Sequence, residues 1–83
     1  METMQIDVVA NWKPLEAVCA HEERPNFMHM GRVGTIELYK HRITRRYLNI
    51  DSATGEFLLY EPPGQFRAVE RTVALEWCGL VSA

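Results

Sequence analysis

The sequence predicts a small α+β domain in which an antiparallel sheet packs against two helices. In the middle of the chain, short apolar segments alternate with turn sequences, which is typical of an antiparallel meander. On either side, apolar residues recur at spacings of three and four, the period of an amphipathic helix. With 83 residues, the whole chain, 1–83, is expected to form one two-layer domain with three or four strands.

Composition indicates a folded protein, since 47% of residues are hydrophobic and 24% are charged. Cys19 and Cys78 lie among apolar neighbours without CxxC spacing, which favours two buried free thiols. No stretch approaches the roughly 18 apolar residues of a membrane span. Glu2 and Asp7 stand where a signal peptide would carry positive charge. We therefore expect a cytoplasmic protein.

The first helix is expected over residues 14–24. Pro14 suits a first helical turn, where its missing N–H costs nothing. Pro25 ends the helix, because the residue before a proline is pushed out of the α region. The apolar face of this helix is formed by Leu15, Val18 and Cys19. Residues 4–9 could form a short strand or lead into this helix, and their length does not decide between the two.

The meander is expected after a short strand at 27–30 and a bend or bulge near Gly31 and Gly34. The connection DSATGE, residues 51–56, has turn chemistry, with a glycine, Gly55, to take a positive φ. The predicted strands of the meander cover residues 33–40, 43–50 and 57–61.

Register is predicted by asking which pairing gives two chemically distinct faces. A four-residue loop at 52–55 sets Ile50 opposite Phe57, and matching parity for the first strand completes an apolar inner face. That inner face consists of Ile36, Leu38, Leu48, Ile50, Phe57 and Leu59. The outer face then carries Glu37, Tyr39, Arg45, Tyr47 and Tyr60. On this register Tyr47 lies opposite Tyr60, Arg46 opposite Glu61, and Arg45 within reach of Glu37.

The second helix is expected after the break at Pro62-Pro63-Gly64. Its predicted apolar stripe has spacings of three, four, four and three, and Gly79 is a candidate C-cap. The stripe consists of Phe66, Val69, Val73, Trp77 and Leu80.

Charge is distributed unevenly along the chain. The net charge is −2 and the pI is near 5.9, which disfavours a dedicated nucleic-acid binder. Residues 38–50 nevertheless hold four of the nine Lys and Arg residues and none of the eleven acids. This segment is therefore the most basic part of an acidic chain.

The basic segment and its neighbour on the sheet supply the candidate binding residues: Tyr39, Lys40, His41, Arg42, Arg45, Tyr47 and Tyr60. Tyr and Arg are enriched at protein interfaces, so we expect this face to contact another protein surface, first of all a second copy in a homodimer. The alternative is single-stranded RNA or DNA. Its phosphates would contact Lys40, Arg42 and Arg45, and its bases would stack on Tyr39 and Tyr47.

The sequence predicts neither catalytic residues nor a metal or cofactor site. His21, His29 and His41 fall on different elements without ligand spacing, and both cysteines lie on core stripes. No glycine-rich loop has the spacing of a phosphate-binding motif. We therefore expect a non-enzymatic interaction or accessory protein. A weaker alternative is a small enzyme or ligand carrier whose site lies between sheet and helices.

Overall fold

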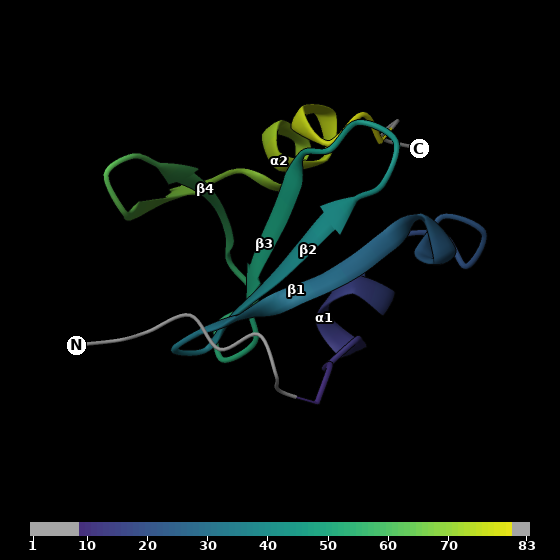
Figure 1. Cartoon of the computed structure of the whole chain (residues 1–83), viewed down its shortest axis with the longest axis horizontal. Coiled ribbons are helices and arrows are strands. Elements are labelled where there is room, and N and C mark those ends of the chain that lie inside the picture. The colour runs from purple at the N-terminus through teal and green to yellow at the C-terminus, as the bar shows by residue number, and fades with distance from the viewer. Residues whose placement is uncertain (1–8, 81–83) are drawn as a thin grey trace.

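The computed structural model describes residues 9–80, so most of the ambiguous segment 4–9 lies outside it. A five-stranded antiparallel sheet runs in the order β1-β2-β3-β4-β5, with helices near both ends (Figure 1). The predicted α+β class and meander are confirmed, but the sheet has five strands instead of three or four. The elements are α1 (Lys13–Glu16), a 3₁₀-helix (Arg24–Asn26), β1 (Phe27–Val33), β2 (Ile36–His41), β3 (Tyr47–Asp51), β4 (Phe57–Glu61), β5 (Gln65–Val69) and α2 (Arg71–Trp77).

The fifth strand, β5, occupies the first part of the segment that was predicted to form the second helix. The helix prediction is therefore wrong for this part of the chain. β5 pairs with β4 along five positions, and α2 begins only at Arg71. Phe66 and Val69 are three apart, a spacing that suits a helix face, but the first four residues of the segment, QFRA, also alternate polar and apolar residues as a strand does. The turn at 62–64 brings this segment beside β4, so the hairpin decides between the two patterns.

The first helix is shorter than predicted, although its apolar face is correct. It ends at Glu16, and the Val18 N–H already bonds to the Leu15 carbonyl three residues back. Such i→i+3 bonds tighten and terminate a helix. Leu15 is fully buried, and Val18 and Cys19 pack against the core as predicted.

The predicted irregularities around the glycines are confirmed. The pairing of β1 with β2 shifts between His29 and Gly31, which marks a bulge. At the β3–β4 turn, Gly55 has φ 81° as expected. Asp51 accepts hydrogen bonds from the Thr35 hydroxyl and the Ala53 N–H, both at 2.8 Å, and these bonds lower the pKa of its carboxyl group.

The predicted register is right for one hairpin and wrong for the other. Ile50 lies opposite Phe57 as predicted. In the β2–β3 hairpin, however, Tyr39 lies opposite Leu48, so Tyr39 shares the face of Leu48 instead of opposing it. The loop closes through the His41 N–H and the Arg46 carbonyl, and Arg45 within it has φ 65°. A shift of one residue moves every side chain of a strand to the other face.

The core lies on one face of the sheet, between the sheet and both helices. Trp12, Val18, Cys19 and Val69 pack against it from its margin. Its buried members are Leu15, Phe27, Tyr39, Leu48, Ile50, Phe57, Ala74, Leu75, Cys78 and Leu80. We call this side the covered face. Predicted inner residues Ile36 and Leu38 belong to the opposite side, because Ile36 pairs with Asp51 and Leu38 with Asn49.

Candidate functional site

The side of the sheet opposite the core, which we call the open face, carries no helix among the described residues. One row of directly paired residues crosses all five strands on this face: Gly31, Leu38, Asn49, Leu58 and Ala68. A neighbouring row includes Lys40 paired with Tyr47, and Tyr60 paired with Phe66. The open face therefore presents mostly apolar and aromatic side chains.

A hollow of about 460 Å³ lies on the open face, and we call it the apolar hollow. The Tyr60 and Phe66 rings meet edge to face, with centroids 5.5 Å apart, and Tyr60 remains 53% exposed. Residues from all five strands and from the β4–β5 turn line the hollow: Val33, Leu38, Tyr47, Asn49, Tyr60, Gly64 and Phe66. None of them is charged. Its volume falls within the range of about 300–1,000 Å³ typical of ligand sites.

Asn49 is the buried polar residue of the open face. It is 1% exposed, and its Nδ2 donates to the Leu58 carbonyl at 3.1 Å. Its Oδ1 is buried and has no hydrogen-bond partner within residues 9–80. A buried acceptor left unpaired costs about 1–3 kcal/mol, so the position carries a polar group that folding does not satisfy.

Strands β3 and β4 separate beyond Asn49, and the gap between them forms a second hollow. Their pairing comprises two positions, Asn49 with Leu58 and Ile50 with Phe57. Figure 1 shows the β4–β5 hairpin leaning away from β3 toward the left of the view. The resulting hollow of about 350 Å³, which we call the notch, is lined by Arg45, Arg46, Tyr47, Asn49, Leu59, Tyr60, Glu61, Arg67 and Trp77.

The notch combines three guanidinium groups with a single carboxylate. Arg46 stacks on the Trp77 ring, with 4.2 Å from Cζ to the ring centroid, and donates to the Trp77 carbonyl at 3.1 Å. Glu61 accepts from Arg67 Nε at 2.9 Å. Arg45 is exposed, and its side chain has no partner among residues 9–80. The predicted pairs Arg46–Glu61 and Arg45–Glu37 are therefore wrong.

The predicted binding residues divide between the two faces of the sheet. Tyr39 and His41 are buried on the covered face, because the β2–β3 register differs from the prediction. Tyr47 and Tyr60 share the open face as predicted, but the predicted pairing of the two is not formed, because β3 and β4 pair only at Asn49–Leu58 and Ile50–Phe57. Lys40 lies beside them, with Nζ 5.8 Å from the centre of the Tyr47 ring. Sequence reasoning thus grouped residues that the fold separates.

The β2–β3 turn is held by its own side chains. His41 Nδ1 accepts from the N–H groups of Ile43 and Thr44, both at 3.3 Å. Arg42 donates through Nε to Asn26 Oδ1 at 3.1 Å. The predicted site residues His41 and Arg42 therefore take part in shaping the turn, while Arg45 extends from it without a side-chain partner in the described chain.

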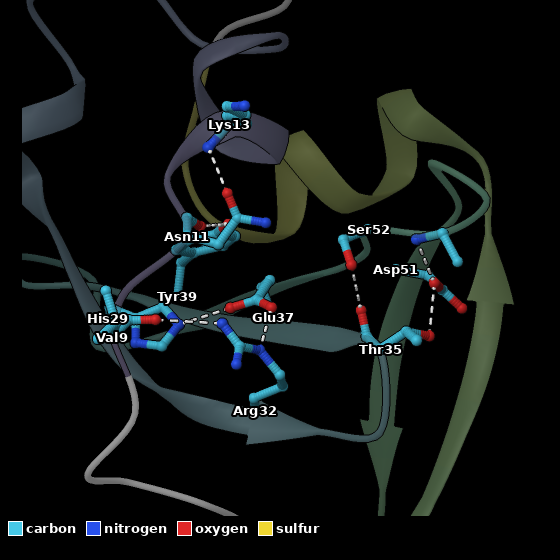
Figure 2. Close-up of polar contacts among 11 residues, drawn as sticks. Val9, Asn11, Lys13, His29, Arg32, Thr35, Glu37, Tyr39, Asp51 and Ser52 are labelled. Carbon is cyan, nitrogen blue, oxygen red and sulfur yellow. Dashed lines mark hydrogen bonds and ion pairs between the residues drawn. The ribbon is translucent and has the colours of Figure 1, made fainter.

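A cluster of ionisable side chains surrounds the buried Glu37 on the covered face, and we call it the ion cluster. Figure 2 shows Glu37 between His29 and Arg32. Glu37 is 1% exposed; its Oε1 lies 2.7 Å from His29 Nε2, and its Oε2 accepts from Arg32 Nε. The register error placed Glu37 on the outer face, which is why sequence reasoning missed this cluster. Its pairing with His29 and Arg32 depends on the bulged β1–β2 hairpin.

The ion cluster fastens the start of the described chain to the sheet. Arg32 Nη2 donates to the Val9 carbonyl at 3.1 Å, and the Tyr39 hydroxyl donates to the Asn11 carbonyl. Trp12 stacks on Tyr39, with centroids 5.6 Å apart, and lies edge-on to His29 (Figure 2 shows the polar contacts). Burial, and then the nearby Glu37, raise the pKa of Tyr39. Both carboxylate oxygens are engaged, so the cluster is organised as a structural clamp.

Outside the apolar hollow, the notch and the ion cluster, the described residues offer few other groups that could react or bind a ligand. Cys78 is a buried free thiol whose pKa burial raises to about 12, and burial also raises the pKa of the half-buried Cys19. Within residues 9–80, no three His, Cys, Asp or Glu side chains gather as metal ligands would. Over the same range, no helix has the length and apolar character needed to cross a membrane. Comparison of the chain with protein-family models, curated proteins and solved structures finds no match.

Proposed function

We propose that this chain is a non-catalytic interaction protein, located in the cytoplasm, whose open face is covered by a second copy of itself. The apolar hollow is the observation that carries the proposal. Its lining contains no charge, and the large rings of Tyr60 and Phe66 stand beside it. Contiguous apolar surface of this kind marks a contact site more often than a free surface.

The occupant we favour is a second copy because the open face offers both a projection and a recess. Tyr60 stands 53% exposed at the margin of the apolar hollow. Across a two-fold axis, Tyr60 of each copy would enter the hollow of the other, as an isologous interface requires. A chain of 83 residues also has a small core, and burying this face would add to its stability.

The buried groups support a role without catalysis. Glu37, the one buried carboxylate of the described chain, is occupied by His29 and Arg32. The Cys78 thiol, with its pKa raised to about 12, stays protonated and unreactive at neutral pH. The apolar hollow contains no pair of acid and base, and Asn49 is its buried polar group.

Sedimentation velocity over a wide range of protein concentration tests the dimer. We expect the average mass to rise toward twice the monomer mass, and Phe66→Glu to keep the protein monomeric by placing charge in the apolar hollow. Gln65→Glu is the matched control, since it adds a charge to the next, exposed position of β5 and should dimerise normally. Circular dichroism shows whether each variant is folded. A wild-type protein that stays monomeric at every concentration would refute self-association.

A further inference from the structure

We infer that the notch between β3 and β4 binds a nucleotide unit of single-stranded nucleic acid. This goes beyond self-association and depends on a different part of the surface. The apolar hollow is lined by Val33, Leu38 and Phe66, whereas the notch is lined by Arg45, Arg67 and Trp77. Only Tyr47, Asn49 and Tyr60 line both, which allows variants to separate the two activities.

The cations of the notch are available for a phosphate. Arg45 is exposed and its side chain has no partner among residues 9–80, while its backbone N–H is fixed to the His41 carbonyl at 2.8 Å. Arg67 is paired with Glu61, but both side chains are about half exposed, and such pairs contribute little to stability. A phosphate can therefore replace Glu61 as the partner of the Arg67 guanidinium at little cost in stability. Planar guanidinium groups also suit phosphate oxygens.

The rings of the notch are placed for a base. Trp77 is 45% exposed on α2, and Tyr60 stands across the gap on β4. The Arg46 guanidinium already lies over the Trp77 ring, with Cζ 4.2 Å from the ring centroid, so the two form a stacked platform on whose free faces a base can lie. Single-stranded nucleic acids bind to aromatic rings and guanidinium planes by stacking, with little dependence on sequence. Trp77 was predicted to be a core residue, and its exposure is what creates this platform.

Asn49 supplies an unpaired hydrogen-bond acceptor, and a base can provide the missing donor. Its Nδ2 is committed to the Leu58 carbonyl, so the amide offers only its Oδ1, which lacks a donor in the described chain. Every nucleobase except those blocked by modification carries an N–H on its Watson–Crick edge. Asn49 lines the notch, so a base that enters beside it gains this hydrogen bond once the neighbouring side chains move off the buried oxygen.

The same observations favour a single strand over other anionic partners. The notch, at about 350 Å³, has room for one base and not for a duplex. An acidic peptide would use the arginines but would leave the Trp77 and Tyr60 rings without a stacking partner. The net charge of −2 predicts modest affinity, and the few cations of the notch predict a shallow salt dependence, because the slope grows with the number of phosphates contacted.

Fluorescence anisotropy with a labelled oligothymidylate at low salt tests the inference. We expect binding whose logarithm falls linearly with the logarithm of salt concentration, with a slope of about 0.7 per phosphate contacted. Arg45→Asn should weaken binding about tenfold and reduce the slope by roughly one contact. Asn is chosen because it tolerates the positive φ of this position. Arg71→Asn removes the same charge from an exposed position of α2 outside the notch and should bind as the wild type does.

A second variant and three competitors complete the test. Binding of the oligothymidylate should quench the fluorescence of the wild-type protein. Trp77→Leu should lose both binding and this quenching, whereas Arg71→Asn, outside the notch, should keep both. The inference is overturned if no binding occurs at low salt, or if Arg45→Asn and Arg71→Asn behave alike. It is also overturned if polyglutamate or a DNA duplex competes as well as the oligothymidylate, or if free thymidine monophosphate binds equally tightly. Because Tyr60 lines both surfaces, binding is measured at protein concentrations below those at which sedimentation shows a dimer.

Discussion

The two faces of the sheet use the same kinds of residue in opposite ways. On the covered face, Tyr39 is fully buried and donates its hydroxyl to the Asn11 carbonyl; on the open face, Tyr60 is half exposed. On the covered face, Glu37 has both oxygens engaged; on the open face, the Asn49 Oδ1 has no partner within residues 9–80. Folding therefore accounts for the polar groups of one face and leaves those of the other to be explained by binding.

The ion cluster gives the largest test of this comparison. Glu37→Ala leaves His29 and Arg32 without their shared carboxylate. Removing one partner of a buried ion pair costs about 3–5 kcal/mol of stability. We therefore expect urea denaturation to show a loss of that order in the free energy of unfolding. Glu61→Ala, which removes the exposed partner of Arg67, should cost less than about 1 kcal/mol. Equal losses from the two variants would show that Glu37 is not a clamp.

The next test compares two buried leucines on opposite faces. Leu48→Ala removes side-chain volume from the closed core and should cost about 2–5 kcal/mol, since a cavity remains. Leu38 is 3% exposed but lines the apolar hollow, where water can enter after truncation. We expect Leu38→Ala to lower the free energy of unfolding of the monomer by about 2 kcal/mol or less. A cost as large as that of Leu48→Ala would mean that the open face is packed like a core.

The last test is the dependence of stability on alkaline pH, in which the change per pH unit is smaller than the losses expected for Glu37→Ala and Leu48→Ala. Burial raises the pKa of Cys78 from 9.0 to about 12, so the folded protein keeps a proton that the unfolded chain releases. The contribution of Cys78 is complete below pH 9 and is lost as the pH rises from 9 to about 12. The slope is at most about 1.4 kcal/mol per pH unit for one group. Denaturation of the wild type and of Cys78→Ala across this range should show a shallower slope for the variant.

Local patterns predicted much of the fold. The alternation of apolar residues and the turn chemistry of 51–56 located the β3–β4 hairpin, and its loop length set Ile50 opposite Phe57 correctly. Helical spacing identified the buried side of α1, including Leu15. These features depend on residues close together in the sequence, so a local pattern contains the information needed.

The errors arose where one residue or one distant contact decides the structure. The loop between His41 and Arg46 reverses the face of β2, which hid Glu37 and moved Tyr39 into the core. Phe66 and Val69 fit a helix as well as a strand until β4 lies beside them. The notch could not be predicted, because it forms where β3 and β4 part and unites segments from 45 to 77.

The short pairing of β3 with β4 has a mechanical consequence. Two residue pairs join the three-stranded part of the sheet to the β4–β5 hairpin, which otherwise contacts α2. The β4–β5 hairpin is therefore attached to the rest of the sheet by a short ladder. The distance between Tyr47 and Tyr60 is not set by pairing between their strands. A ligand that widens or narrows this gap breaks no hydrogen bond of the ladder, so the sheet can adjust to the ligand without unfolding any strand.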